Sequence, residues 1–330
     1  MNKTTTLLLS LSITAAIIAG CNSNNTENDA SSVNKSEETS SSINSTANEP
    51  TQTEESKLSN GDEIAKILGS TLWQGTKVYD KDNNDLTKEN SNFIAIAKYD
   101  DQTSRYEFFD KESKNSRGDY GTFFMTNDGK YRVLISESKG TQGVVELTEV
   151  TDDKYIYKRI GKDANGNDVE VFVEHEPYTG SELTFTSPEK TFETITGKID
   201  EHVDGDQILA DTLWVGSVAL DENGNDVSEY NQNFFALAKY DAETNHYEFF
   251  DKQTGQSRGD YGYYNVLNNN KLRAHVSLGD KNYGAVLEVT ELNKNKFTYK
   301  RIGKDKNGND IPITVEHIPY TGELNPEFTQ

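Results

Sequence analysis

The stretch YEFFDK at 106–111, followed by SRGDYG at 116–121, recurs unchanged at 247–252 and 257–262. On both sides of it, a shift of 141 residues superimposes Thr71–Ser136 on a second copy, with 32 of 66 positions identical. After one inserted residue, Lys158–Gly180 matches Lys300–Gly322 at 17 of 23 positions. Because this period far exceeds that of a solenoid repeat, each copy is a complete domain.

Short runs of aromatic and β-branched residues alternate with turn signals within each copy. Eight sequential strands of this kind favour an up-and-down meander, and Asn-Gly at 165–166 and 307–308 predicts hairpins. A short helix is expected before each Trp-containing strand, at Asp62–Leu68 and Asp206–Leu209. In the second copy the strands are predicted near Leu213–Leu220, Asn233–Tyr240, His246–Asp251, Arg258–Val266, Leu272–Leu278, Ala285–Glu291, Phe297–Ile302 and Ile311–His317.

A helical turn, a strand carrying Leu-Trp-x-Gly and a run of antiparallel hairpins together resemble the lipocalin and calycin architecture. The resemblance implies an all-β fold of two tandem calycin/lipocalin-like antiparallel up-and-down barrels, each with a short N-terminal helix. In such barrels Trp73 and Trp214 lie on the first strand and face the core, with Arg159 and Arg301 stacked over them. The alternative is that both Trp side chains are exposed and form a ligand-binding surface.

The block AKYD…YEFFDK…SRGDYG spans Ala97–Gly121 and again Ala238–Gly262. It is similar to a block in Gram-positive surface lipoproteins that are built from a duplicated domain of unknown function. This resemblance covers both domains and implies no particular activity.

The N-terminus carries Lys3, an apolar run over Leu7–Ile18 and the tetrapeptide Ile-Ala-Gly-Cys that ends at Cys21. It resembles a bacterial lipoprotein signal peptide, since the run is too short to span a bilayer stably. The resemblance implies that Cys21, the only cysteine, is diacylated and anchors the chain to the outer face of the cell membrane. The expected organisation is a signal peptide at 1–20, a disordered tether at 21–60, barrels at 61–185 and 203–328, and a linker at 186–202.

The chain has a formal net charge of −22, and its acidic residues are spread over the whole length. Such a negative field repels phosphate backbones, so nucleic acid is excluded as a partner. Membrane contact is expected through the diacylglycerol on Cys21 alone.

The aromatic clusters at 106–109 and 247–250 place aromatic side chains on both faces of a strand. Either all of them pack in a core, or one set lines a pocket in the barrel mouth. The candidate binding or core residues are Trp73, Tyr106, Phe108, Arg117, Asp119 and Tyr120, with Trp214, Tyr247, Phe249, Arg258, Asp260 and Tyr261 in the second copy.

Each copy also contains Arg-Gly-Asp, the integrin-recognition tripeptide, at 117–119 and 258–260. An exposed loop tip would make it an adhesion motif. The aromatic residues that follow it favour a strand instead, in which Gly118 permits a bulge or a close approach while Arg117 and Asp119 pair locally.

One histidine repeats, His175 and His317, each within Val-Glu-His-x-Pro-Tyr-Thr-Gly. A single histidine per domain cannot build a zinc site, so the ring is expected to pack against Tyr178 or Tyr320. The acidic segments at 163–168 and 305–310 are interpreted as hairpin turns and not as calcium loops, since an aspartate occupies the sixth position, where an EF-hand needs glycine. No cofactor, metal or catalytic motif is predicted.

These patterns predict a lipid-anchored cell-surface protein with two tandem, non-catalytic β-barrel binding modules. Its partner is expected to be a small ligand or an extracellular protein. One alternative is an adhesin-like module that binds a host protein, and another is an extracellular enzyme that acts on the envelope.

Overall fold

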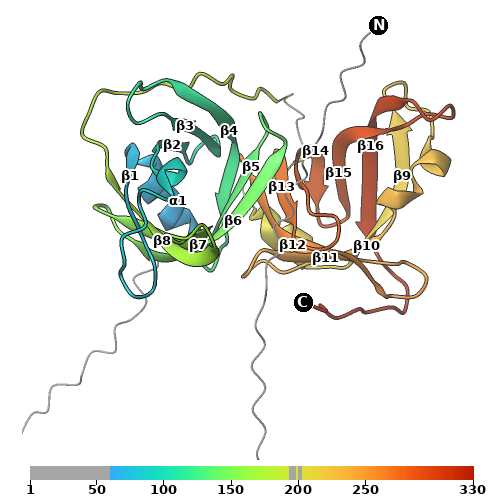
Figure 1. Ribbon diagram of the computed structural model, residues 1–330. Coiled ribbons are helices and arrows are strands. Elements are labelled where there is room, and N and C mark those ends of the chain that lie inside the picture. Colours follow the sequence, from blue (N-terminus) through green and yellow to red (C-terminus); the bar gives the residue numbers. More distant parts are fainter. Residues whose placement is uncertain (1–59, 193–197, 200–202) are drawn as a thin grey trace, which may run out of the picture. The chain divides into compact units, whose positions relative to one another are not determined.

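The computed structural model describes residues 60–192, 198–199 and 203–330, which contain two closed eight-stranded antiparallel barrels (Figure 1). The first barrel comprises α1 (Gly61–Gly69), β1 (Trp73–Tyr79), the 3₁₀ turn η1 (Ser91–Phe93), β2 (Ile96–Asp100), β3 (Arg105–Phe109), β4 (Ser116–Met125), β5 (Tyr131–Ser136), β6 (Thr141–Val150), β7 (Tyr155–Lys162) and β8 (Asp168–Pro177). The second comprises α2 (Gly205–Ala210), β9 (Trp214–Asp221), the 3₁₀ turns η2 (Ser228–Tyr230) and η3 (Gln232–Phe234), β10 (Leu237–Tyr240), β11 (His246–Phe250), β12 (Ser257–Leu267), β13 (Leu272–Ser277), β14 (Gly284–Asn293), β15 (Lys296–Lys304) and β16 (Asp310–Pro319).

Strand order follows chain order in both barrels, and the last strand closes on the first. The β7 and β8 strands pair continuously from Tyr155↔His175 to Lys162↔Asp168, and β8 then pairs with β1. The predicted all-β, up-and-down barrel fold with one short helix before each first strand is therefore confirmed.

One predicted strand is shorter than expected. The segment predicted as Asn233–Tyr240 begins with η3, and β10 starts only at Leu237. The buried side chain of Asn231 holds this connection, since its amide donates to the carbonyls of Val227 and Lys304 and its oxygen accepts from the Lys304 N–H. These bonds fix a 3₁₀ conformation in which the backbone cannot join the sheet.

The acidic segments are hairpin turns, as predicted. In the first barrel one carboxylate oxygen of Asp163 accepts from the backbone N–H groups of Asn165 and Asn167, both at 2.8 Å. Gly166 has φ +84°, a value that glycine adopts without strain. Asp305 makes the same pair of bonds in the second barrel. These aspartates therefore serve to turn the backbone between paired strands.

The two tryptophans are core residues with no exposed surface. The indole Nε1 of Trp73 donates to the Leu68 carbonyl at 3.0 Å, and that of Trp214 donates to the Leu209 carbonyl at 2.9 Å. Each bond ties the first strand to the helix before it, which satisfies the buried indole N–H. The inward orientation is confirmed, and the alternative of an exposed Trp surface is wrong.

The predicted stacking of Arg159 and Arg301 on these tryptophans is also wrong. Arg159 lies over Phe93 at 3.9 Å from the ring centroid, and Arg301 lies over Phe234 at 3.6 Å. The Trp73 ring is already covered by α1 and by the edge of Tyr155 at 5.0 Å. The guanidinium groups therefore meet the phenylalanines of the 3₁₀ turns instead.

The aromatic cluster in β3 divides between the two faces of the strand. Tyr106 and Phe108 point inward, whereas Phe109 packs outside with Ile96 and Leu183. Tyr120 pairs with Glu107 on the outer face, and Tyr261 pairs with Glu248 in the same way.

The signal peptide at 1–20, Cys21 and the tether up to residue 59 lie outside the described residues, as do 193–197 and 200–202 of the linker. Within the described ranges, no helix has the length and apolar character needed to cross a bilayer.

Candidate functional site

Each barrel contains a pocket at the end opposite its helix. Gly61 and Gly69 of α1 contact the residues just after the C-terminal ends of β4 and β2. The pocket residues of these two strands come from their N-terminal halves. The pocket volume is about 340 Å³ in the first barrel and about 290 Å³ in the second.

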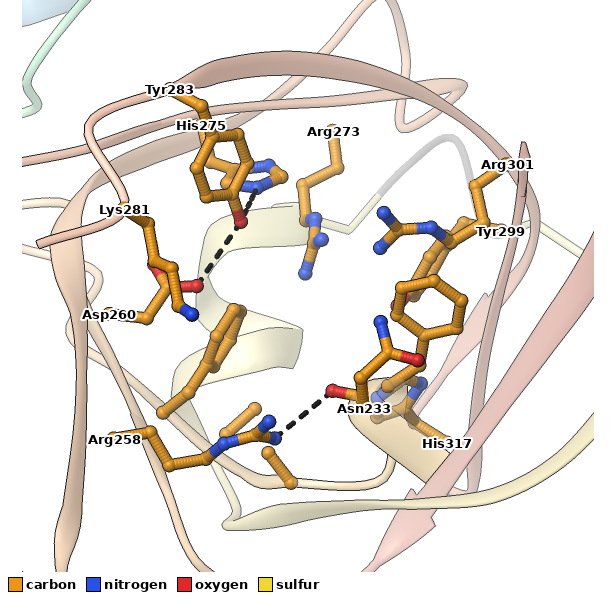
Figure 2. A pocket seen from close by; sticks show the side chains of 14 residues that line it. Asn233, Arg258, Asp260, Arg273, His275, Lys281, Tyr283, Tyr299, Arg301 and His317 are labelled. Carbon is orange, nitrogen blue, oxygen red and sulfur yellow. Dashed lines mark hydrogen bonds between the residues drawn. The ribbon is translucent and has the colours of Figure 1, made fainter. Parts of the chain in front are cut away.

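The two pockets are built from equivalent positions of the repeat. The first is lined by Asn92, Phe93, Ala95, Ala97, Phe108, Arg117, Asp119, Arg132, Leu134, Lys139, Tyr155, Tyr157, Arg159 and His175. The second, shown in Figure 2, is lined by Asn233, Phe234, Ala236, Ala238, Phe249, Arg258, Asp260, Arg273, His275, Lys281, Tyr283, Tyr299, Arg301 and His317.

Arginine is concentrated in these pockets. The chain contains seven arginines, and six of them line the two pockets, three in each. Among the lysines that the structure describes, only Lys139 and Lys281 do so. One aspartate lines each pocket, so four cationic side chains face one acid in a chain of net charge −22. The pockets are therefore local cationic sites in an acidic protein.

The deepest cation of the first pocket is Arg132, which is only 3% exposed. It lies on the inner face of β5, and its Nη1 donates to the hydroxyls of Tyr99 at 2.7 Å and Tyr155 at 3.3 Å. Its guanidinium lies 4.5 Å from the centroid of the Tyr157 ring. The Nε atom has no partner. Desolvation opposes the charge, but the surrounding tyrosine oxygens dominate and raise the pKa of Arg132.

Arg273 occupies the same place in the second pocket and is also 3% exposed. Its Nη1 donates to the Tyr240 hydroxyl at 2.5 Å, it lies 4.9 Å from the Tyr299 ring, and its Nε has no partner. Phe297 replaces the second tyrosine at this site, so this guanidinium has one hydrogen bond fewer. In the described part of the chain, the hydrogen bonds of both buried arginines go to tyrosine hydroxyls, and neither guanidinium forms an ion pair with a carboxylate.

The Arg-Gly-Asp segments lie within β4 and β12. Gly118 has φ +63°, and the register shifts between Phe108 and Phe109, so the predicted bulge is confirmed. The predicted local pairing of Arg117 with Asp119 is wrong, because the Arg117 guanidinium donates to the carbonyls of Asn92 at 2.8 Å and Ile94 at 2.9 Å. Both side chains line the pocket and do not form the loop tip that an adhesion motif requires.

Asp119, the one acidic residue that lines the first pocket, accepts hydrogen bonds from three side chains. Asp119 accepts from the hydroxyls of Tyr106 at 2.9 Å and Ser136 at 2.8 Å, and from Lys139 Nζ at 3.1 Å. Burial, together with this carboxylate, raises the pKa of Tyr106. These three partners engage the Asp119 carboxylate, and the ion pair of Arg117, at 4.0 Å, is with Asp110.

The repeated histidines are buried, but not against the predicted tyrosines. The His175 ring stacks on Tyr155 at 4.3 Å, and the His317 ring stacks on Tyr299 at 5.4 Å. Tyr178 packs elsewhere, against an outer cluster around Leu183. Desolvation, and then the charge of the nearby buried arginine, lower the pKa of each histidine to about 3. Both rings are therefore neutral at physiological pH.

Six of the predicted candidate residues line the pockets: Phe108, Arg117, Asp119, Phe249, Arg258 and Asp260. Trp73, Tyr106, Trp214 and Tyr247 belong to the cores, while Tyr120 and Tyr261 lie on the outer faces. The sequence reasoning missed Arg132 and Arg273. A signal was available, since six of the seven arginines occupy equivalent positions of the two repeats.

The chemistry of the pockets is that of an anion site with an apolar wall. Phe93, Phe108, Ala95 and Ala97 supply the apolar surface of the first pocket, and the guanidinium groups supply the charge. Within the described ranges, no three His, Cys, Asp or Glu side chains gather closely enough to hold a metal ion.

The search of curated proteins found no match. Among solved structures, the chain resembles a protein of unknown function from the DUF3598 family of Nostoc punctiforme, with 11% identity and a TM-score of 0.22. The similarity covers 80% of this chain and all of that one. The family model for the domain of unknown function DUF4822 matches twice, at residues 65–185 and 206–328. The chain therefore belongs to the DUF4822 family and contains two copies of its domain.

Proposed function

We propose that each barrel binds a small organic anion in its arginine-lined pocket, and that the chain presents these two modules on the outer face of the cell membrane. The observation that carries the proposal is the buried arginine of each pocket, Arg132 or Arg273, which has no carboxylate partner among the described residues and keeps an unpaired Nε.

A buried guanidinium is costly for a folded protein, because removal of a charge from water carries a penalty of several kcal/mol that only good partners offset. Neutral tyrosine hydroxyls and aromatic faces offset part of it. An apolar side chain of similar volume would serve a purely structural role at less cost. Two copies of this arrangement in one chain favour a ligand that completes it.

Arginine suits this role better than lysine, since its planar group donates two parallel hydrogen bonds to a carboxylate or phosphate. The strong bias of the pockets toward arginine therefore points to an oxyanion. Arg117 and Arg159 add positive charge at the same site in the first barrel.

The size and walls of the pocket limit the ligand further. A volume of about 290–340 Å³ corresponds to about ten water molecules, enough for a compact organic acid and far too little for a polymer. The Phe93 and Phe108 rings favour an apolar or aromatic part next to the charged group. The role assigned to the pockets is binding, without a catalytic step.

The membrane part of the proposal depends on the sequence. The tetrapeptide that ends at Cys21 resembles a lipobox, and a diacylated Cys21 would hold the chain at the outer face of the membrane. The polar residues that follow would let the barrels extend from the surface.

Isothermal titration of the chain that begins at residue 22 with phenylacetate tests the binding site. We expect two sites per chain, one site after Arg132→Met, and none after the double change Arg132→Met with Arg273→Met. Loss of a buried charged partner typically weakens binding by about thirtyfold or more.

Arg105→Met is the matched control, because Arg105 is the one arginine outside the pockets and instead bonds Ser187. Phenylacetamide, the uncharged analogue, is expected to bind poorly to every chain. Phenylacetate binding that survives the double substitution would show that the pockets are not the anion sites.

A further inference from the structure

The two pockets differ on one wall. Leu134 in the first pocket is replaced by His275 in the second, at the same inward position of β5 and β13. Tyr283, from the start of the β14 hairpin, lines only the second pocket (Figure 2). The duplicated site has therefore diverged in chemistry while keeping its arginines.

A hydrogen-bonded chain runs along this wall of the second pocket. The Tyr283 hydroxyl lies 3.3 Å from Asp260 Oδ2 and 3.1 Å from His275 Nε2, as the dashed lines in Figure 2 show. The hydroxyl has one proton, which it donates to the carboxylate, so its oxygen accepts from His275 Nε2–H.

This arrangement fixes the histidine tautomer. With the proton on Nε2, the Nδ1 atom of His275 carries a lone pair and acts as an acceptor. His275 is 3% exposed, and its Nδ1 has no partner. The second pocket therefore combines an unsatisfied buried acceptor with the donors of Arg273.

The first pocket has the equivalent arginine, Arg132, and each pocket also contains a repeated histidine, His175 or His317, whose Nδ1 has no partner. The two pockets differ in polarity at the position of Leu134 and His275. Leu134 presents methyl groups at the equivalent position, and Asp119 is paired with Lys139 at 3.1 Å. A ligand hydroxyl placed next to Leu134 would lose its hydrogen bond to water. The leucine side chain offers no polar group to replace that bond, so binding would be weakened.

We infer that the second pocket selects a hydroxylated organic acid, whose hydroxyl donates to His275 while its carboxylate binds Arg273, and that the first pocket selects an acid with an apolar group at that position. This inference rests on the proposed anion binding. Sites built to bond a hydroxyl discriminate against the analogue that lacks it, because the polar group of the site is then left unpaired.

Mandelate and phenylacetate form the test pair, since they differ by one hydroxyl next to the carboxylate. In the Arg132→Met chain, titration measures binding to the second pocket alone. In the Arg273→Met chain, it measures binding to the first pocket alone. We expect the second pocket to prefer mandelate by about two- to tenfold, the effect of one hydrogen bond, and the first to prefer phenylacetate.

Two further changes in the Arg132→Met chain locate the effect. His275→Leu copies the residue of the first pocket and is expected to abolish the mandelate preference. Tyr283→Phe keeps the aromatic ring but removes the hydroxyl that accepts from His275 Nε2–H. The proton can then move to Nδ1, so the preference for mandelate over phenylacetate should decrease.

Equal mandelate-to-phenylacetate ratios in the two pockets, or a ratio that His275→Leu leaves unchanged, would overturn the inference while anion binding stands. Failure of both acids to bind either pocket would overturn the proposed function and this inference with it.

Discussion

The buried histidine of the first barrel predicts a loss of stability in mild acid. The pKa of His175 is lowered to about 3 by desolvation and by the charge of Arg132. In the unfolded chain the same ring titrates near its ordinary value of about 6.5. Between these two values the unfolded chain binds a proton that the folded barrel does not, so stability is full above pH 6.5 and falls as the pH decreases toward 3.

The expected size of this loss follows from the slope of about 1.4 kcal/mol per pH unit for one proton. From pH 6.5, where the unfolded ring is half protonated, to pH 4.5, His175 alone should remove about 2.3 kcal/mol from the free energy of unfolding of the first barrel. A domain of this size is stable by about 5–15 kcal/mol, so the change is large enough to measure.

The perturbation is His175→Phe, which keeps an aromatic ring against Tyr155 and removes the titrating group. Urea unfolding at pH 6.5, 5.5 and 4.5 can be followed by NMR through the indole N–H signals. Trp73 reports the first barrel and Trp214 the second, since each indole bonds its own helix.

In the variant, the loss of first-barrel stability over this range should be smaller by the contribution of His175, while the second barrel keeps its wild-type dependence. Carboxylates with lowered pKa values, such as Glu107 and Asp128, keep a weaker acid dependence in the first barrel. An unchanged acid slope at Trp73 in His175→Phe would refute the account of a buried neutral histidine.

Three other predictions follow from the core, from a buried acid and from the N-terminus. Trp73→Ala should cost the first barrel about 3–5 kcal/mol and leave the unfolding of the second nearly unchanged, as read from Trp214; equal losses in both would contradict separate cores. Burial raises the pKa of Asp206 to about 7, so the folded form keeps a proton that the unfolded chain loses near pH 4, and second-barrel stability should fall as pH rises between these values. Asp206→Asn should flatten that dependence in urea unfolding at several pH values. Cys21→Ala should abolish labelling by a fatty-acid probe in cells, and label that persists would exclude the lipid anchor.

The fold was largely predictable because its signals are local. Strand alternation and Asn-Gly turns depend on a few neighbouring residues, and they located the eight strands and the hairpins of the second barrel. The exception is the segment before Leu237, where the buried amide of Asn231 bonds Lys304, far along the chain, and replaces strand pairing with a 3₁₀ turn. No local pattern contains that contact.

The site was only half predictable. The aromatic run at 106–109 and the Arg-Gly-Asp tripeptide at 117–119 made three residues candidates from the sequence. These residues, Phe108, Arg117 and Asp119, do line the pocket. Arg132 did not, because an arginine within a strand is ordinarily a solvent-exposed residue. Its burial depends on closure of the barrel, which brings Tyr99 and Tyr155 to its side.

The sequence by itself determined the duplication, the β-class of both domains and the turn positions, since each depends on repeat spacing, on strand alternation or on local turn residues. Only the tertiary structure decided what the interior contains. Closure of eight strands sets residues from β2 to β8 around one space, and whether a charge there is paired depends on neighbours tens of residues away. For this reason Arg159 meets Phe93 and not Trp73, and six arginines that are scattered in the sequence form two cationic pockets.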